Sequence, residues 1–179
     1  MSMNRNDIAE YAIEALKKAG ADKAACTVSQ GRKEEFNVEA NKFSLLRTIF
    51  NDQLSLKALL GGRKGVAIVN KLDKDSIDKA VTDCISLAKS ATPDDAEDIA
   101  EKILNKTFDQ SIGGPDMNSL FTRTKEFLEQ VKDEYPKIIL EGVMSDFSAG
   151  QTTYCNSNGV QFTGNDELYH MTAMFSAKD

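Results

Sequence analysis

Residues 54–90 read LSLKALLGGRKGVAIVNKLDKDSIDKAVTDCISLAKS, and the spacing of the apolar residues changes once within this segment. Apolar and polar side chains alternate in residues 54–60 and again in 65–70, on either side of a glycine turn, which predicts two strands with one buried face. From Leu72 to Ser90 the apolar residues recur every three or four positions, which predicts an amphipathic helix. Two strands followed by a helix with one apolar stripe indicate a sheet with that helix packed on it.

The same two periods extend over the rest of the chain. Helical spacing predicts further helices from Asn6 or Asp7 to Ala19 and from Asp116 or Asn118 to Tyr135, and a short acidic helix over residues 94–104. The predicted strands comprise residues 26–29, 36–40, 44–50, 54–60, 65–70, 138–146, 152–156, 160–163 and 168–175. Turns are predicted at Gly31, Asn51-Asp52 and Asn158-Gly159, since these residue types tolerate positive φ angles.

These elements predict an α/β chain of the α+β type. We expect a mostly antiparallel sheet with about three to four helices, packed largely on one face, because each helix has a single apolar stripe. Residues 1–179 form one predicted domain with an internal connection at about residues 91–117, where prolines, glycines and acidic residues gather. The last strand ends four residues before Asp179, so we expect the sequence to be cut before a further domain.

The net charge and the hydropathy of the chain restrict the kinds of partner that it can bind. The chain has 28 acidic and 22 basic side chains, a net charge of -6 that repels a polyanion. The densest basic cluster is Arg63-Lys64, with Lys57 and Lys71 nearby, and we interpret it as a solvated turn. The chain contains no apolar run long enough to cross a bilayer and no signal peptide pattern at its start. We therefore expect a soluble cytoplasmic protein that binds neither nucleic acid nor membrane directly.

Residues for a metal or nucleophilic site are scarce. A catalytic zinc site commonly takes about three protein ligands, yet His170 is the one histidine. Cys26, Cys84 and Cys155 lack CxxC spacing and are expected to be reduced, mostly buried thiols. Cys155 and His170 lie on neighbouring predicted strands and could form a nucleophile pair, but no third group is evident to orient the histidine. We predict no catalytic, cofactor-binding or metal residue in this sequence.

The glycine-rich residues 61–65 resemble a phosphate-binding loop in composition only. They lie between two predicted strands, so no helix N-terminus follows them to hold an anion. The segment is better explained as a hairpin turn.

The order of several short motifs resembles the N-terminal domain of the TldD/PmbA family, and the resemblance covers nearly the whole chain. The motifs are YAIEALKKAGAD (11–22), GRKGVA (62–67), NKLD (70–73), AKSATPDD (88–95), NSNGV (156–160) and LYHM (168–171). Arg63-Lys64 within the glycine turn is more similar to the PmbA-like half of the family than to the TldD-like half.

The resemblance implies a two-domain, peptidase-related protein of about twice this length or more. Its C-terminal, β-rich domain would carry a zinc motif for peptide hydrolysis in TldD-like members, while PmbA-like members lack the ligands and pair with a TldD-like partner. Members are often labelled modulators of DNA gyrase, although the acidic balance does not support direct DNA binding here. This sequence itself would perform no chemistry and hold no zinc.

Two roles stay open. In the first, the domain contributes to dimer assembly and peptide access in a homo- or hetero-oligomeric peptidase. In the second, it is a non-catalytic interaction module that binds extended segments by adding them as strands to its sheet.

Overall fold

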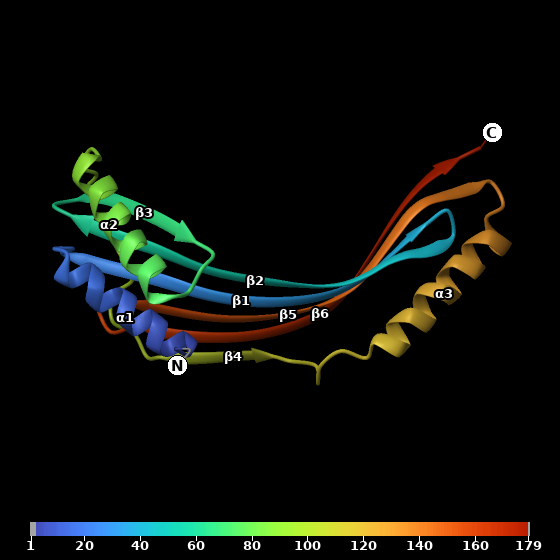
Figure 1. Ribbon diagram of the computed structural model, residues 1–179, viewed down its shortest axis with the longest axis horizontal. Helices are drawn as coiled ribbons and strands as arrows, with labels where there is room; N and C mark the ends of the chain where they lie inside the picture. The colour runs from blue at the N-terminus through green and yellow to red at the C-terminus, as the bar shows by residue number, and fades with distance from the viewer. Residues whose placement is uncertain (1–2, 179) are drawn as a thin grey trace. The chain divides into compact units, whose positions relative to one another are not determined.

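The computed structural model describes residues 3–178, which form three helices and a six-stranded sheet (Figure 1). In chain order the elements are α1 (Arg5–Lys18), β1 (Lys23–Glu39), β2 (Lys42–Leu60), β3 (Arg63–Val69), α2 (Lys74–Ser90), β4 (Lys106–Gln110), α3 (Met117–Glu134), β5 (Ile138–Asn156) and β6 (Gln161–Ala177). The strand order is β3-β2-β1-β5-β6-β4. The predicted α+β class with a mostly antiparallel sheet is confirmed.

Backbone contacts divide the chain into two compact units. The first comprises the described residues up to Gln30, together with Asn51–Asp109 and Gly150–Asn165. The second comprises Gly31–Phe50, Gln110–Ala149 and the described residues from Asp166 onward. Strands β1 and β6 lead from the first unit into the second, whereas β2 and β5 lead back. Consecutive strands in the order β2-β1-β5-β6 are therefore antiparallel.

Two predicted turns are wrong, because the long strands run through them. Gly31 lies inside β1, and Asn51-Asp52 lies inside β2. Both positions fall where a strand passes from one unit to the other, and glycine and asparagine tolerate extended backbone as well as a turn. The actual turn between β1 and β2 is Ala40-Asn41, with φ of 49° and 61°. Two successive residues with positive φ form the turn type whose twist matches that of paired strands.

The core of the first unit lies between the sheet and helices α1 and α2, which cover the same face (Figure 1). The N-cap of α1 is Asn4, with a capping box completed by Asp7, so the predicted helix start at Asn6 or Asp7 is wrong by two or three residues; the N-cap of α2 is Asp73. Helix α2 approaches β3 so closely at Gly65 that a Cβ there would lie 2.7 Å from the backbone nitrogen of Ala88, and closer still to the carbonyl oxygen of Cys84. The glycine-rich residues 61–65 therefore connect β2 and β3 and let α2 pack closely on β3, which agrees with their interpretation as a hairpin turn.

The helix predicted for residues 94–104 is wrong. The segment makes one turn at Asp94 and then runs without regular structure to β4. Its acidic residues are held by lysines of the sheet: Lys57 Nζ lies 2.8 Å from Glu97 Oε2, and Lys23 Nζ lies 2.6 Å from Asp98 Oδ1. Lys64 pairs with Glu97 as well. The charges that suggested the start of a helix serve instead to fix the segment on the sheet.

The core of the second unit lies between α3 and the strands. Phe121 of α3 stacks on Phe43, with ring centroids 4.4 Å apart, and contacts the edge of Phe36. The buried hydroxyls of Thr124 and Ser145 are hydrogen-bonded to each other, with 2.8 Å between their oxygens. The predicted third helix is confirmed, with Asp116 as its N-cap.

Strand β4 was not predicted, and it is the exception to the antiparallel pattern. The Asn105 side chain accepts a hydrogen bond from Gln161 N, and the hydroxyls of Thr107 and Thr163 are hydrogen-bonded to each other. The two residues of each pair are 56 positions apart in the sequence. A constant offset means that β4 runs parallel to β6. All five of its residues are exposed, which explains why it has no apolar pattern in the sequence.

Candidate functional site

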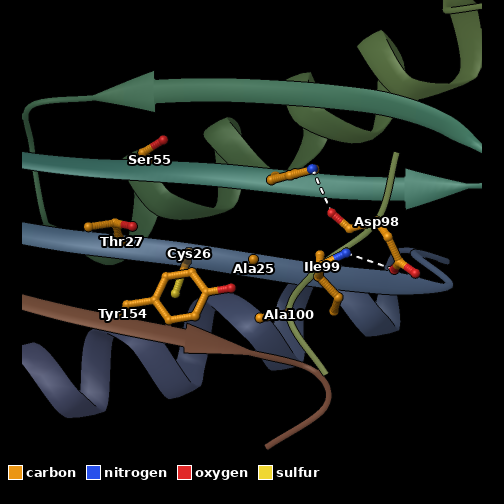
Figure 2. A pocket seen from close by; sticks show the side chains of 9 residues that line it. Ala25, Cys26, Thr27, Ser55, Asp98, Ile99, Ala100 and Tyr154 are labelled. Atoms are coloured by element: carbon orange, nitrogen blue, oxygen red, sulfur yellow. Dashed lines mark hydrogen bonds between the residues drawn. The ribbon is translucent and has the colours of Figure 1, made fainter. Parts of the chain in front are cut away.

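A small pocket of about 260 Å³ opens on the sheet face of the first unit that α1 and α2 do not cover (Figure 2). Thr27, Ser55 and Tyr154 come from three neighbouring strands and form its floor, while Ile99 and Ala100 form one wall. The wall is fixed by Asn156, whose side-chain amide donates to the Ala100 carbonyl at 2.8 Å.

The chemistry of this pocket is limited to hydrogen bonding. No described residue is hydrogen-bonded to the hydroxyl of Thr27 or Ser55, so both hydroxyls can bond a ligand. Lys57 also lines the pocket, but its ammonium group is paired with Glu97 and donates to the Asp98 carbonyl at 2.9 Å. The pocket therefore presents neutral hydroxyl groups rather than an unpaired charge.

The three cysteines are all free and buried, as predicted. Burial and the neighbouring Cys155 raise the pKa of the Cys26 thiol to about 12, although a hydrogen bond with the Cys155 backbone acts in the opposite direction. Burial also raises the pKa of Cys84, whose thiol donates to the Gly65 carbonyl. Such thiols are protonated at neutral pH and are weak nucleophiles.

Cys155 and His170 do not form the nucleophile pair that the sequence suggested. Cys155 belongs to the apolar core cluster of the first unit, whereas His170 belongs to the second unit, where its Nδ1 lies 3.5 Å from Asp146 Oδ2.

Among residues 3–178 no group of three or more histidine, cysteine or acidic side chains could hold a metal ion. None of the helices in this range is long and apolar enough to span a membrane.

Two buried carboxylates in the second unit were missed by the sequence analysis. Glu35 is 1% exposed and Asp146 is 3% exposed. Lys33 Nζ lies 3.0 Å from Glu35 and 3.6 Å from Asp146, and Arg47 Nη2 lies 2.8 Å from Glu35. Burial alone would raise the pKa of Glu35, but the hydrogen bonds and charges of Lys33 and Arg47 outweigh it and hold the pKa below its usual value. The two basic residues followed by two acidic residues at positions 32–35 could have indicated such pairing.

The second unit has two strand edges without a neighbouring strand. The pairing of β2 with β3 covers only Leu54–Leu60 of β2, and β4 ends at Gln110. The segment after β4 follows β6 as far as Tyr169, whose hydroxyl accepts a hydrogen bond from Asp116 N. On the outer side of β6, residues 171–177 have no partner strand within the described chain.

The two open edges differ in character. Residues 42–50 of β2 carry Lys42 and Arg47, and charged side chains on an edge discourage pairing with another strand. Residues 171–177 of β6, MTAMFSA, carry no charge. Met174 is 63% exposed and Phe175 is 62% exposed, so apolar side chains are exposed on both faces of this edge. An uncharged, apolar, open edge is a template for strand pairing.

Comparison with known proteins identifies the class of fold. No family model and no curated protein matches the chain. Several solved structures match it over nearly its whole length, among them the three described next. TldE from Thermococcus kodakarensis has a TM-score of 0.77 and 17% identity, and the match covers 96% of this chain and 40% of that one.

The other two structures are described as candidate modulators of DNA gyrase. The protein from Bacteroides thetaiotaomicron has a TM-score of 0.77 and 18% identity, with 97% of this chain and 41% of that one covered. The protein from Thermotoga maritima has a TM-score of 0.71 and 13% identity, with 98% and 40% covered. This chain therefore spans about two fifths of the length of each.

The chain has the fold of a region of TldE and of these gyrase-modulator proteins. That fold is the one which the resemblance to the N-terminal domain of the TldD/PmbA family implies, and this expectation is confirmed.

Proposed function

We propose that this chain is the non-catalytic N-terminal domain of a TldD/PmbA-type, peptidase-related cytoplasmic protein, and that it binds extended polypeptide segments by strand addition. The observation that carries the proposal is the open edge of β6 at residues 171–177. Its backbone offers unpaired N–H and C=O groups on the outer side, and its flanking side chains are apolar and uncharged. An added strand would gain backbone hydrogen bonds and apolar contacts at once.

Successive residues of β6 direct their backbone N–H groups alternately toward β5 and away from it, so the outward-facing groups can be identified. Lys178 N donates to the Lys137 carbonyl, so Lys178 faces β5. In an antiparallel strand the direction of the backbone groups alternates, which makes Ala173, Phe175 and Ala177 the residues whose N–H groups point outward. Phe175 is also the exposed aromatic side chain of this edge.

The role in a peptidase assembly follows from the same edge. A segment delivered by a peptide substrate, or by a TldD/PmbA partner subunit in a homo- or hetero-oligomer, would be held in the extended conformation that peptidases require. Hydrolysis would occur elsewhere in the assembly, since a metalloprotease centre would need ligands beyond those of this chain.

A pair of substitutions at one residue tests the proposal. Phe175→Pro removes an outward N–H without removing a bond of the β5–β6 ladder, whereas Phe175→Ala keeps the N–H and removes the ring. The probe is a fluorescein-labelled peptide of alternating valine and threonine with a lysine at each end, and its binding is followed by fluorescence anisotropy. A second peptide with prolines in place of the valines cannot form a ladder and serves as the control.

We expect the peptide to bind the wild-type chain and the proline peptide not to bind. Phe175→Pro should weaken binding about tenfold or more, and Phe175→Ala less, because each lost backbone bond counts for about 1 kcal/mol and is joined by steric exclusion of the strand. Equal binding of both peptides, or equal loss in both variants, would show that side-chain contact rather than strand addition holds the peptide. Light scattering on the unliganded chain reports whether a second copy occupies the same edge.

A further inference from the structure

Cys26 and Cys155 lie opposite each other on neighbouring strands of the first unit. β1 and β5 are adjacent and antiparallel. Ser157 N donates to the Ala24 carbonyl at 2.8 Å, and Ala24 N donates to Ser157 Oγ at 3.0 Å, so residue 24 faces residue 157. Two steps along each strand in opposite directions bring residue 26 opposite residue 155.

The side chains of both cysteines point to the same side. Both belong to the apolar core cluster beneath α1, and the Cys26 thiol donates to the Ala9 carbonyl of that helix. Facing residues in an antiparallel pair have Cα atoms roughly 4.5 to 5.5 Å apart. That separation lies within the roughly 4.4 to 6.8 Å that a disulfide spans, so the Cα spacing of a facing pair is compatible with a bond.

A pocket of about 270 Å³ lies beside one of the two cysteines. Cys155 lines this pocket together with Glu10, Asn156, Gly159 and Val160. Cys26 lies behind it in the core. Cys84 is placed differently, because it sits on α2 and its thiol bonds the carbonyls of Gly65 and Leu56.

We propose that Cys26 and Cys155 are a redox-active pair, in which Cys155 reacts with a small uncharged peroxide and Cys26 resolves the product into a disulfide between β1 and β5. The Cys155 thiolate attacks one peroxide oxygen, the O–O bond breaks, and a sulfenic acid and a hydroxide result. The Cys26 thiolate then attacks the Cys155 sulfur and displaces a second hydroxide. Two thiols and one hydrogen peroxide give one disulfide and two waters, with the peroxide reduced by two electrons.

The surroundings set the rate and the selectivity of this pair. Burial and the carboxylate of Glu10 raise the pKa of Cys155, which keeps most of the thiol protonated at neutral pH. The pair should therefore react more slowly than free cysteine, and faster as the pH rises. Glu10 and Glu14 at the pocket should also disfavour a negatively charged oxidant such as oxidised glutathione relative to hydrogen peroxide.

Peptide mapping of the folded chain tests the proposal directly. The purified protein is treated with hydrogen peroxide at pH 8, its unchanged fold is verified by circular dichroism, and free thiols are blocked before digestion with trypsin. Trypsin places the three cysteines in separate peptides, residues 24–32, 80–89 and 138–178. We expect peptides 24–32 and 138–178 to be joined by a disulfide that disappears on reduction. Peptide 80–89 should instead carry the blocking group on Cys84, which shows that a buried cysteine outside the pair is not oxidised.

Two variants make the test specific. Cys84→Ala should leave the linked species unchanged. Because Cys26, with a pKa of about 12, supplies little thiolate for the second step, the effect of Glu10→Gln is measured on the first step. The rate at which Cys155 loses its free thiol should rise about twofold or more, because more Cys155 thiolate is present. A link through residues 80–89, a link between two chains, or sulfinic acid on Cys155 without any link would each overturn the pairing. An unchanged or lower rate in Glu10→Gln would overturn Cys155 as the first thiol to react.

Discussion

Replacing Gly65 with alanine is expected to destabilise the first unit strongly. The added Cβ would sit 2.7 Å from the Ala88 nitrogen and closer to the Cys84 carbonyl oxygen, and both obstacles are helix backbone that no side-chain rotation can clear. Helix α2 would have to move away from β3. Its buried residues, Ile77, Ala80, Val81, Cys84, Ile85 and Ala88, would lose part of their contact with the sheet.

The cost can be estimated from that displacement. Overpacking a well-packed core costs about 1 to 3 kcal/mol, and occasionally more. Because a whole helix must shift here, we expect a loss of about 3 kcal/mol or more in the free energy of unfolding. The assay is urea unfolding followed by circular dichroism, with the denaturant dependence compared between variants to verify that the same surface is exposed.

Gly164→Ala is the matched control. Gly164 also lies in a strand of the first unit, has no positive φ, and leaves open space around an added Cβ. Its replacement should change stability by less than about 1 kcal/mol, in the stabilising direction, because alanine restricts the unfolded chain. A loss at Gly65 no larger than at Gly164 would refute the close approach of α2 to β3.

Three further changes test other parts of the structure. Ala40→Gly should stabilise the chain by roughly 0.5 to 1 kcal/mol in thermal unfolding, since Ala40 has φ of 49°, which alanine disfavours and glycine adopts without strain; destabilisation would mean that the β1–β2 turn has another geometry. Glu35→Gln should cost about 1 to 3 kcal/mol at pH 7, as the buried carboxylate loses its charged partners. The depressed pKa of Glu35 makes its contribution fully present above its unfolded pKa and lost as pH falls through the folded value. Below about pH 4 the Gln variant and the wild type should therefore converge, and a constant difference down to pH 2 would contradict the pairing. Thr124→Val should cost about 1 to 2 kcal/mol in urea unfolding by leaving the buried Ser145 hydroxyl without its partner, and Thr124→Ser should cost less; a larger loss in Thr124→Ser than in Thr124→Val would show that the methyl group rather than the hydrogen bond matters.

The helices were predictable because caps and periodicity agreed. Asp73 and Asp116 precede amphipathic patterns and accept from the backbone N–H of Ser76 and Ser119 as caps should. The Asn158-Gly159 turn was predictable for a similar reason, since glycine at φ of 83° satisfies a requirement that local sequence records.

Long-range pairing could not be predicted from local patterns. Ala40 gave no sign of a turn, because alanine disfavours the positive φ that the β1–β2 hairpin imposes on it. The segment of residues 94–104 has the composition of a helix start, but Lys23, Lys57 and Lys64 bind its carboxylates from strands remote in sequence. The open edge at residues 171–177 likewise depends on where β4 ends, which no alternation of residues in β6 reveals.

Residue-resolved amide exchange on β6 tests strand addition most directly. The isotope-labelled chain is studied by nuclear magnetic resonance with and without the alternating valine and threonine peptide. If the peptide adds to the edge of β6, it should slow exchange at the outward amides of Ala173, Phe175 and Ala177, while the inward amides that already bond β5 change little. Protection at β2 instead, or no protection at any of these three amides while the peptide is bound, would contradict strand addition at β6.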